Sequence, residues 1–434
     1  MFKAIAYIAL AVLLFSCKKS ASPPPVTPPV KPPVTPPAKT LGITAISPTS
    51  GPDSTSVTIT GGGFGTTAAN DSVLFDGHPA SISSINDSVL VALVPLRAGT
   101  GSVLVKTGGK TATGPVFTYV YTYIVTTLAG GVPGDADGTG TAAKFNDPFG
   151  IACDTAGNVI VADAGNSKIR MVTPAGVVTT VAGSGTPGFN DGAASTAEFK
   201  VPPAVAVDGL DNILVGDVYN YKIREINTAG IVSTVAGTTL GETDGPVATA
   251  QFDSPAWLAE DSSGKIYVCD AHYIRVISGG NVSTLYDGYN YSSTLVSFTA
   301  VAVGPDKTLY LLDDFGANVF SLTTAGVFAV LAGNGILTYL DGPAASASFS
   351  SAKGLSVDAA GDILVADQAN QRIRLISSGG AVSTIAGSGT AGEVDGKGVA
   401  AQFYYPSAVA VDKQSGTIYV LEPMSNRIRK ITVQ

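Results

Sequence analysis

The chain has 434 residues, of which 13% are charged, and its formal net charge is −8. This length exceeds what one compact core usually holds, so we expect two or more folded units. Because the charge is acidic and no stretch concentrates Lys and Arg, the composition argues against a nucleic-acid partner, which requires a basic surface.

The first 16 residues (1–16) have the pattern of a secretory signal peptide. Lys3 is followed by an apolar run over residues 4–15, which is too short to span a membrane comfortably. The sequence LFSC, which ends in Cys17, resembles the lipobox of bacterial lipoproteins, and the resemblance implies that Cys17 becomes a lipidated N-terminus. Lys18-Lys19 lacks the Asp of an inner-membrane retention signal, which favours the outer membrane, on its periplasmic or its cell-surface side. A plain signal peptide with an incidental cysteine is the alternative.

Residues 17–40 link this anchor to the rest of the chain and are rich in proline. Such a density of proline favours polyproline II, which extends by about 3.1 Å per residue and is semi-rigid. Because the segment follows the lipidation site, we interpret it as a stalk that holds the folded units away from the membrane. A docking peptide for a proline-binding module is the alternative.

Residues 41–120 form a separate predicted unit of short β-strands. Runs of alternating apolar and polar residues are separated by turn residues, which is typical of a small β-sandwich. The runs span 43–47, 56–60, 71–75, 80–84, 89–94, 101–107 and 114–119. The string ITAISPTSGPDSTSVTITGGGFG, followed by VLFDG, resembles the IPT/TIG family of immunoglobulin-like domains. In related extracytoplasmic proteins such domains are mostly spacers or interaction modules.

Residues 121–434 contain one unit that is repeated six times. Each copy has four short strand-like runs, here named a to d, and successive copies are about 46–54 residues apart, as in a β-propeller. The first copy reads FGIACD, NVIVAD, SKIRMV and VVTTVAG from Phe149 onward. This pattern, and its later copy GLSVDAAGDILVADQANQRIRLISSGGAVSTIAG, resemble the NHL repeat. The expected fold class is therefore all-β: a small Ig-like β-sandwich followed by a six-bladed β-propeller.

The two ends of the repeat region indicate how the ring closes. The sixth copy stops at Gln434 after run c, whereas a run of type d, from Tyr123 to Gly130, precedes the first copy. We expect this N-terminal strand to complete the last blade, because that arrangement removes open sheet edges inside the ring.

The loops between the runs sort onto two faces. The a–b and c–d turns are tight and share one face, whereas the b–c turns and the crossings between blades share the other. The crossings are about 20 residues long, and loops of that length are usually functional. We therefore expect a ligand to meet the face of b–c turns and crossings, which we call the crossing face.

Most crossings contain an Asp-Gly pair followed by small residues and a Phe, as in Asp191-Gly192 and Phe199. One carboxylate per crossing does not supply the six or more oxygens of a hard-cation site, so we favour a structural role. We expect Asp to cap a turn or a short helix and Phe to pack between blades. The b–c turns repeat Asp-x-x-Asn-x-[Lys/Arg]-Ile-Arg, which we interpret as a structural ladder whose Arg pairs with acids between blades.

Residues that depart from the repeat are more informative than those that obey it. On the crossing face the departures are mainly tyrosines, whose flat apolar ring and hydroxyl suit both sugar rings and protein partners. The candidate ligand-binding residues are Tyr219, Tyr221, Tyr273, Tyr289, Tyr291, Tyr339, Tyr404 and Tyr405. Trp257, at the start of strand a in the third copy, either faces the channel mouth or plugs the core, and we favour the plug.

These patterns favour a lipid-anchored extracytoplasmic binding or adhesion protein whose propeller presents one face to a glycan or a protein. NHL propellers are mainly interaction platforms, which the resemblance implies by analogy alone. The alternative is a propeller lyase or hydrolase with a carboxylate site at the channel mouth, built from Asp287, Asp314 or Glu393. We assign no catalytic residue, metal or cofactor, because the chain shows no His cluster or Ser/His/Asp set. Cys153 and Cys269 are expected to be buried apolar residues.

Overall fold

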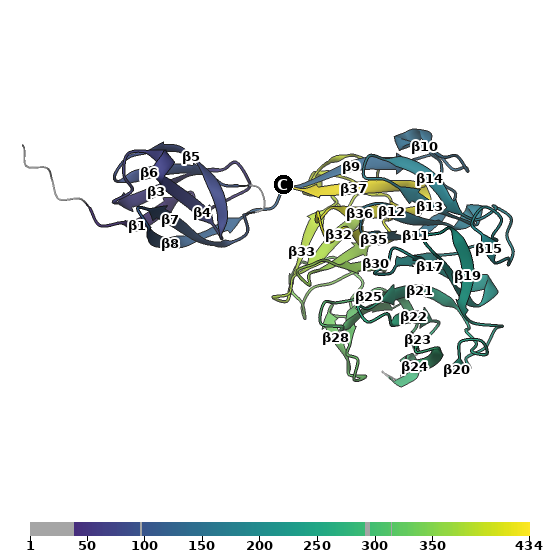
Figure 1. The fold of residues 1–434 in the computed structure, drawn as a ribbon. Coiled ribbons are helices and arrows are strands. Elements are labelled where there is room, and N and C mark those ends of the chain that lie inside the picture. The colour runs from purple at the N-terminus through teal and green to yellow at the C-terminus, as the bar shows by residue number, and fades with distance from the viewer. Residues whose placement is uncertain (1–38, 96–97, 291–295, 314) are drawn as a thin grey trace, which may run out of the picture.

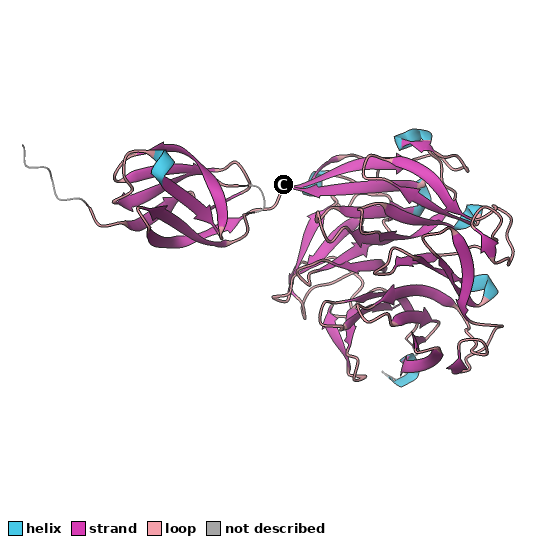
Figure 2. Ribbon diagram, in the orientation of Figure 1, coloured by secondary structure: helices cyan, strands magenta, loops and turns pink. Residues whose placement is uncertain are grey.

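The computed structural model describes residues 39–95, 98–290, 296–313 and 315–434. The signal peptide, Cys17, most of the Pro-rich linker, Tyr291 and Asp314 lie outside these described residues. Figure 1 shows the described chain as two units, and Figure 2 shows that strands dominate both. The helices are 3-10 helices of three residues: η1 (Ala68–Asn70), η2 (Gly140–Ala142), η3 (Ala164–Asn166), η4 (Val218–Asn220), η5 (Gly288–Asn290), η6 (Gly398–Ala400) and η7 (Pro423–Ser425). Among the described residues, no helix has the length and hydropathy to cross a membrane.

The first unit folds one sheet over a single core. Its strands are β1 (Gly42–Ser47), β2 (Ser50–Gly51), β3 (Ser56–Gly62), β4 (Asp71–Phe75), β5 (His78–Ile85), β6 (Val89–Leu93), β7 (Gly101–Thr107) and β8 (Lys110–Tyr119), in the order β1-β3-β6-β5-β4-β7-β8-β2. The long strand β5 pairs with β4 through His78–Ala80 and with β6 through Ser81–Ile85, so it joins the two layers. Phe64, Phe75 and Phe117 are fully buried between them.

The second unit is a six-bladed β-propeller, as expected, with one sheet per blade. From blade 1 to blade 6, the innermost strands a are β11 (Pro148–Cys153), β16 (Ala204–Val207), β21 (Pro255–Glu260), β25 (Phe298–Val303), β30 (Ala352–Val357) and β35 (Ala408–Val411). Strands b are β12 (Val159–Asp163), β17 (Ile213–Asp217), β22 (Ile266–Asp270), β26 (Leu309–Asp313), β31 (Ile363–Asp367) and β36 (Ile418–Glu422).

Strands c are β13 (Lys168–Val172), β18 (Lys222–Ile226), β23 (Tyr273–Ser278), β27 (Val319–Leu322), β32 (Arg372–Ile376) and β37 (Arg427–Val433). Strands d are β14 (Val177–Ala182), β19 (Ile231–Ala236), β24 (Asn281–Asp287), β28 (Phe328–Ala332), β33 (Ala381–Ala386) and, for blade 6, β9 (Tyr123–Gly130). The antiparallel pairing of β9 with β37 runs from Tyr123 opposite Val433 to Gly130 opposite Arg427.

Five blades carry a short fifth strand on the outside of strand d. These strands are β10 (Gly138–Thr139), β15 (Gly192–Ala193), β20 (Gly245–Pro246), β29 (Gly342–Pro343) and β34 (Gly396–Lys397). Each belongs to a crossing, whose tip reaches the c–d turn; in blade 1, for example, the N–H of Gly140 donates to the carbonyl of Gly176, 2.8 Å away. The crossings therefore cover the outer edges of the blades and are not confined to one face of the propeller. Much of their length pairs with the blades and is structural.

The propeller core lies between neighbouring blades. Six apolar clusters fill the six interfaces, and the Phe of each Asp-Gly crossing is fully buried in one of them, as predicted. These residues are Phe145, Phe199, Phe252, Phe349 and Phe403. Apolar burial of about 25 cal/mol per Å² makes these inter-blade contacts the main stabilising term of the ring.

Candidate functional site

The repeated Arg of strand c is buried in five blades and is held by acids of its own blade. The residues are Arg170, Arg224, Arg275, Arg374 and Arg429. In blade 2, Nη1 of Arg224 donates to Asp217, 2.9 Å away, and Nη2 donates to Asp191 in the crossing. Asp191 also accepts from the backbone N–H of Thr234 in strand d at 3.2 Å. These contacts lie within a blade, and not between blades as we expected from the sequence.

The crossing Asp also differs from the expected cap. η2 begins without a side-chain cap, whereas Asp137 accepts from Nη2 of Arg170 at 2.5 Å and from the N–H of Thr180 at 3.1 Å. Although partial burial opposes it, the hydrogen bond from Arg170 lowers the pKa of Asp137. For Asp163, burial outweighs the same arginine and raises the pKa. The polar residues of the repeat are thus occupied by structural contacts.

The propeller exposes many large apolar side chains outside its a–b and c–d turns. They come from crossings, b–c turns and the first residues of strand a: Val132, Phe149, Phe189, Val201, Tyr219, Leu240, Tyr289, Phe315, Ile336, Leu337, Tyr339, Leu340, Val394, Val399, Tyr404, Tyr405 and Met424. Exposed apolar side chains form interaction surfaces where they lie together. The predicted tyrosines within the described residues all belong to these segments, but the structure places them in separate groups.

Tyr404 and Tyr405 form the most firmly held of these groups. Their rings meet edge to face, with centroids 5.2 Å apart, and are 37% and 38% exposed. The N–H of Tyr404 donates to Glu422 at 2.8 Å, and the N–H of Tyr405 donates to Gln371 at 2.7 Å; both acceptors are buried. Tyr405 has a φ of 54°, a left-handed conformation that is uncommon for residues other than glycine. The buried acceptors therefore fix the backbone that presents the two rings.

A second group surrounds the b–c turn of blade 3. The ring centroid of His272 is 4.0 Å from that of Tyr273 and 4.7 Å from that of Tyr289. Burial and a hydrogen bond of 3.1 Å to Glu242 raise the pKa of the Tyr273 phenol. Tyr289 is 59% exposed, so this group presents the Tyr289 side chain to solvent.

The remaining predicted tyrosines stand apart from these two groups. Tyr219 and Tyr221 lie in the b–c turn of blade 2, where Tyr219 is 56% exposed. Tyr339 has a structural contact, because its ring centroid is 3.8 Å from the guanidinium carbon of Arg372. In blade 2, Phe189 contacts the equivalent cations, Lys222 and Arg224. Tyr339 therefore occupies a position of the repeat and is not the departure from it that the sequence suggested.

The central channel is obstructed near the crossing face by Trp257. This residue takes the place that Gly150 has in blade 1, and it is partly buried. Trp257 packs against the cluster between blades 3 and 4 and also against the cluster between blades 6 and 1, on the other side of the ring. Its side chain therefore fills the bore of the channel, whereas from the sequence we favoured a plug in the core.

The channel opens instead on the face of the a–b turns, where it has an acidic mouth. A cavity of about 350 Å³ is lined there by residues of blades 6, 1, 2 and 3, and it includes the carboxylates of Asp154, Asp208, Glu260, Asp261 and Asp412. Asp208 accepts backbone N–H groups of Leu210 and Asn212 at 2.8 Å each, so it mainly holds its own turn. Asp154 bonds the a–b turn of blade 1 in the same way.

Glu260 differs from these turn carboxylates and was missed in the sequence. It is the last residue of β21, where the other blades have Cys153, Val207, Val303, Val357 and Val411. Within the described part of the chain its carboxylate accepts no hydrogen bond. Partial burial and the nearby Asp208 and Asp261 raise the pKa of Glu260 to about 6. The contrast between WLAED in blade 3 and AVAVD in blade 2 is the sequence signal that marks Glu260.

The carboxylates named from the sequence do not meet at the channel. Asp287 lies at the end of β24 and accepts from the N–H of Tyr289 at 3.0 Å. Glu393 lies in the crossing before blade 6 and forms an ion pair with Arg427. Asp314 lies outside the described residues. Across the described ranges, no group of three or more His, Cys, Asp or Glu side chains is placed to hold a metal ion.

Comparison with known proteins identifies both units. Residues 41–121 match the IPT/TIG domain family. The propeller has NHL-repeat homologues, among them NHL repeat-containing protein 2 of Homo sapiens, which is 27% identical over 290 residues that cover 63% of this chain and 36% of that protein. The chain spans 18% to 46% of the length of the curated relatives it matches.

Solved structures with both units are also similar. A Bacteroides thetaiotaomicron protein of unknown function has a TM-score of 0.65 and 21% identity, covering 90% of this chain and 98% of that chain. An auxiliary nutrient binding protein from Bacteroides ovatus has a TM-score of 0.57 and 18% identity, covering 90% of this chain and 97% of that chain. At these identities the likeness establishes the fold: a TIG domain and a six-bladed propeller.

Proposed function

We propose that this protein is a lipid-anchored extracytoplasmic binding protein whose crossing face binds a glycan or a protein. The lipid on Cys17 attaches the chain to the outer membrane, and the Pro-rich linker holds the two folded units away from it. In this proposal the propeller is a rigid support, and the exposed aromatic residues supply the contacts with the ligand.

The observation that carries the proposal is the fixed pair Tyr404 and Tyr405. Binding requires side chains and loops to become ordered, at roughly 0.5–1.5 kcal/mol for each flexible side chain. Here buried Glu422 and Gln371 already hold the backbone, while each of the two tyrosines stays more than a third exposed. A rigid, amphipathic pair of this kind binds a flat sugar face or an apolar protein surface with little loss of entropy.

The fold is compatible with such a role. The Bacteroides ovatus protein that resembles this chain over both units is described as an auxiliary nutrient binding protein. Its identity of 18% makes this an analogy of architecture only, and the tyrosine pair supports the proposal independently.

A binding screen on the fragment 41–434 tests the proposal. We expect saturable binding to a glycan on an array or to an extracellular protein. Replacing Tyr404 by Ala should weaken this binding about tenfold or more. The matched control is Leu210→Ala, which removes a side chain that is 78% exposed on the face of the a–b turns. Ligands bound equally by both variants would contradict the proposed face.

The proposed anchor has its own test. Expression with a clickable fatty acid should label the full chain, and Cys17→Ser should abolish the label and release the protein from the membrane fraction. Protease treatment of intact cells then distinguishes the cell surface from the periplasm. Unchanged membrane association of Cys17→Ser would refute the lipid anchor without affecting the proposal for the crossing face.

Glu260 favours a second candidate function, carboxylate-based catalysis at the channel mouth. A carboxyl group with a pKa of about 6 can give and accept protons near neutral pH, and here it borders a cavity of about 350 Å³. A panel of lactone and glycoside substrates would test it. Turnover with a pH inflection near this pKa, lost in Glu260→Gln, would support a lyase or hydrolase.

A further inference from the structure

Among the described residues, blade 4 has no strand outside its strand d, unlike the other five blades. The crossing that enters it runs only from Asp287 to Phe298, whereas the next one runs from Ala332 to Ala352. Its sheet has four strands, and β28 is the outermost strand among the described residues. A strand at the edge of a sheet offers backbone hydrogen bonds to another chain.

The side chains of blade 4 have changed together with the crossing. Strand c has Phe320 in place of the buried Arg, and its ring stacks on Phe328 with centroids 4.9 Å apart. In strand d, Val330 takes the place of Thr180, whose N–H is bound by the crossing Asp of blade 1. Val330 is 42% exposed. The outer strands of blade 4 therefore differ from those of the other blades in their side chains as well as in the crossing before them.

The described ends of the short crossing stay with blade 3. The N–H of Gly288 donates to the carbonyl of His272 at 2.8 Å, and the N–H of Phe298 donates to the carbonyl of Ala271 at 3.0 Å. Both acceptors belong to the b–c turn of blade 3. A side chain on Gly288 would collide with the carbonyl of Val296, so these two positions lie side by side.

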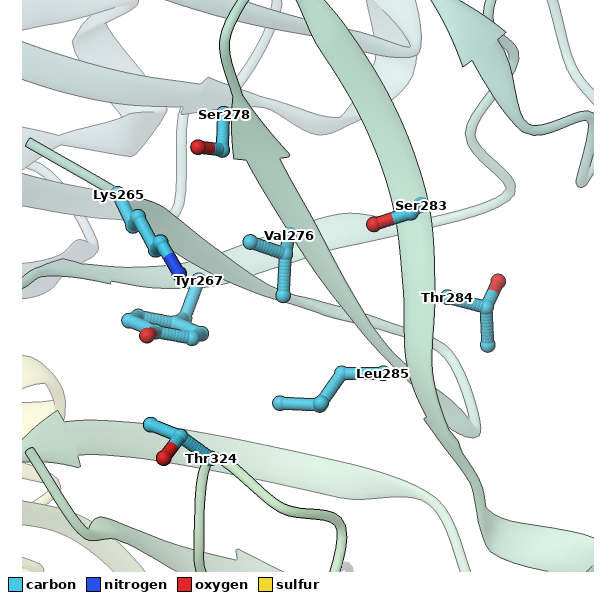
Figure 3. Close-up of a pocket in the computed structure, with 8 residues that line it drawn as sticks. All are labelled: Lys265, Tyr267, Val276, Ser278, Ser283, Thr284, Leu285 and Thr324. Atoms are coloured by element: carbon cyan, nitrogen blue, oxygen red, sulfur yellow. The ribbon is translucent and has the colours of Figure 1, made fainter.

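A cleft of about 230 Å³ lies between blade 3 and the c–d turn that leads into β28 of blade 4. Figure 3 shows Val276 and Leu285 of blade 3 in this cleft, with Thr324 of the c–d turn of blade 4 across from them. In blade 1, the equivalent residues Met171 and Val181 pack in one cluster with the crossing alanines Ala194 and Ala197. The cleft is thus the place where other crossings put their small residues.

We propose that the open side of blade 4 is a docking site for an extended peptide of a partner protein. The peptide adds a strand beside β28 and places small side chains in the cleft, which reproduces in trans what the crossings do in cis. Residues 323–332 carry no charge, so β28 offers the peptide no ion pair. Among the described residues that line the cleft, Lys265 alone is charged. This favours an acidic residue in the part of the peptide that lies next to Lys265.

A second copy of this chain fits the site less well than a foreign peptide. Two copies of β28 could pair with each other, but the cleft would stay empty. In the other blades, the small residues in this place come directly after the fifth strand, and β28 has no such residues free to enter the cleft of a second copy. The chain's own residues of this kind, such as Ala197, Ala250 and Ala347, are fully buried in their own crossings. The strand and the cleft together therefore indicate a partner with a free, extended segment.

A synthetic peptide with the sequence of residues 340–350, LDGPAASASFS, is a suitable probe because this segment occupies the equivalent position in blade 5. We expect saturable binding of the labelled peptide to the fragment 41–434 by fluorescence anisotropy. Val330→Pro removes an outward N–H from an edge strand and should weaken binding about fivefold or more. Val330→Ala keeps the N–H and should bind within about twofold of the unchanged protein.

Thr324→Trp provides a second variant that does not touch the strand ladder, because Thr324 is exposed in the c–d turn. It should also weaken binding by filling the cleft, and circular dichroism and thermal unfolding verify that both variants are folded. Equal binding by all variants, or no binding of the peptide, would overturn the proposal. A dimer in sedimentation that Val330→Pro abolishes would also overturn it, because the edge would then belong to a second copy.

Discussion

Arg224 shows how single residues of the repeat stabilise the blade. It is completely buried, and removing it would leave the buried carboxylate of Asp217 without its cation. Breaking a buried ion pair by removing one partner typically destabilises a protein by about 3–5 kcal/mol. We predict a loss of that size for Arg224→Met, measured by urea denaturation of the fragment 41–434.

Arg372 is the matched control for this prediction, because it is also an Arg of strand c but is only partly buried. Its guanidinium lies on the ring of Tyr339 and donates to two backbone carbonyls. Arg372→Met should therefore cost about 1 kcal/mol. Similar losses for both variants would show that the buried acids are not what makes Arg224 important.

Glu260 should give the protein a specific pH dependence. Its pKa in the folded state, about 6, lies above the ordinary value of 4.5 for a glutamate, so the folded protein binds more protons between these two pH values. The free energy of unfolding contributed by Glu260 is therefore largest below pH 4.5 and falls as the pH rises through 6. We predict that Glu260→Gln is more stable than the unchanged protein at neutral pH and loses this advantage in acid.

The difference in stability between the unchanged protein and Glu260→Gln isolates the effect of Glu260. Other carboxyl groups with raised pKa values, Asp270 and Glu422, are present in both proteins. Denaturant unfolding below, within and above the window provides the measurement. A stability difference that does not change with pH would show that the Glu260 carboxyl is not perturbed by its surroundings.

The roles of some single residues could be predicted from the sequence, and the roles of others could not. Trp257 interrupts a series of Gly and Ala, so its unusual role was visible in the repeat. Glu260 interrupts a series of Val and Cys and was equally visible, but it lies on the face of the a–b turns, whose short loops did not suggest a site. The partner of Arg224 was not predictable, because the spacing of Arg and Asp along the chain does not state which blade supplies the acid.

At the scale of elements, the crossings contribute to the core through their Phe residues. Phe199 is fully buried between blades 1 and 2, and truncating a buried Phe to Ala usually costs about 3–5 kcal/mol. We predict a loss in this range for Phe199→Ala in urea denaturation. Phe189→Ala, in the same crossing but 49% exposed, should cost about 1 kcal/mol through its lost contact with Lys222. Equal effects would mean that the crossing is not anchored through Phe199.

The four main strands of each blade were predictable because each has a run of four or more apolar or alternating residues. The fifth strands were not, since each has two residues, such as Gly138–Thr139, and contains Gly or Pro. For this reason the length of the crossings was interpreted as a functional loop, although much of it covers an edge. The divergence of the crossing before blade 4, from Asp287 to Phe298, was visible in the sequence, but its consequence for β28 needed the three-dimensional arrangement.

At the scale of the whole molecule, the two units have separate cores. The buried cluster of the first unit ends at Tyr119, and the clusters of the propeller begin at Val125. Between them, Thr122 exchanges two backbone hydrogen bonds of 2.8 Å with Gln434, which extends the pairing of β9 with β37. The connection therefore belongs to the last blade of the propeller, and the first unit contributes little to the stability of the ring.

Two truncated fragments test this organisation. Fragment 121–434 lacks the first unit but keeps β9, and its unfolding midpoint should stay within a few degrees of that of 41–434. Fragment 131–434 removes β9 and with it the buried side chains of Val125, Leu128 and Ala129, which should cost about 5 kcal/mol or more.

Calorimetry and near-UV circular dichroism of the three fragments would distinguish the possible outcomes. Removing β9 also leaves β37 at the edge of its sheet, so fragment 131–434 should bind a hydrophobic dye and aggregate on warming. Adding a peptide of residues 121–130 should reverse both effects, because the missing strand pairs with β37 through backbone bonds that a separate chain can also form. A fragment 131–434 as stable as 121–434 would mean that the inter-blade clusters hold the ring closed without this strand.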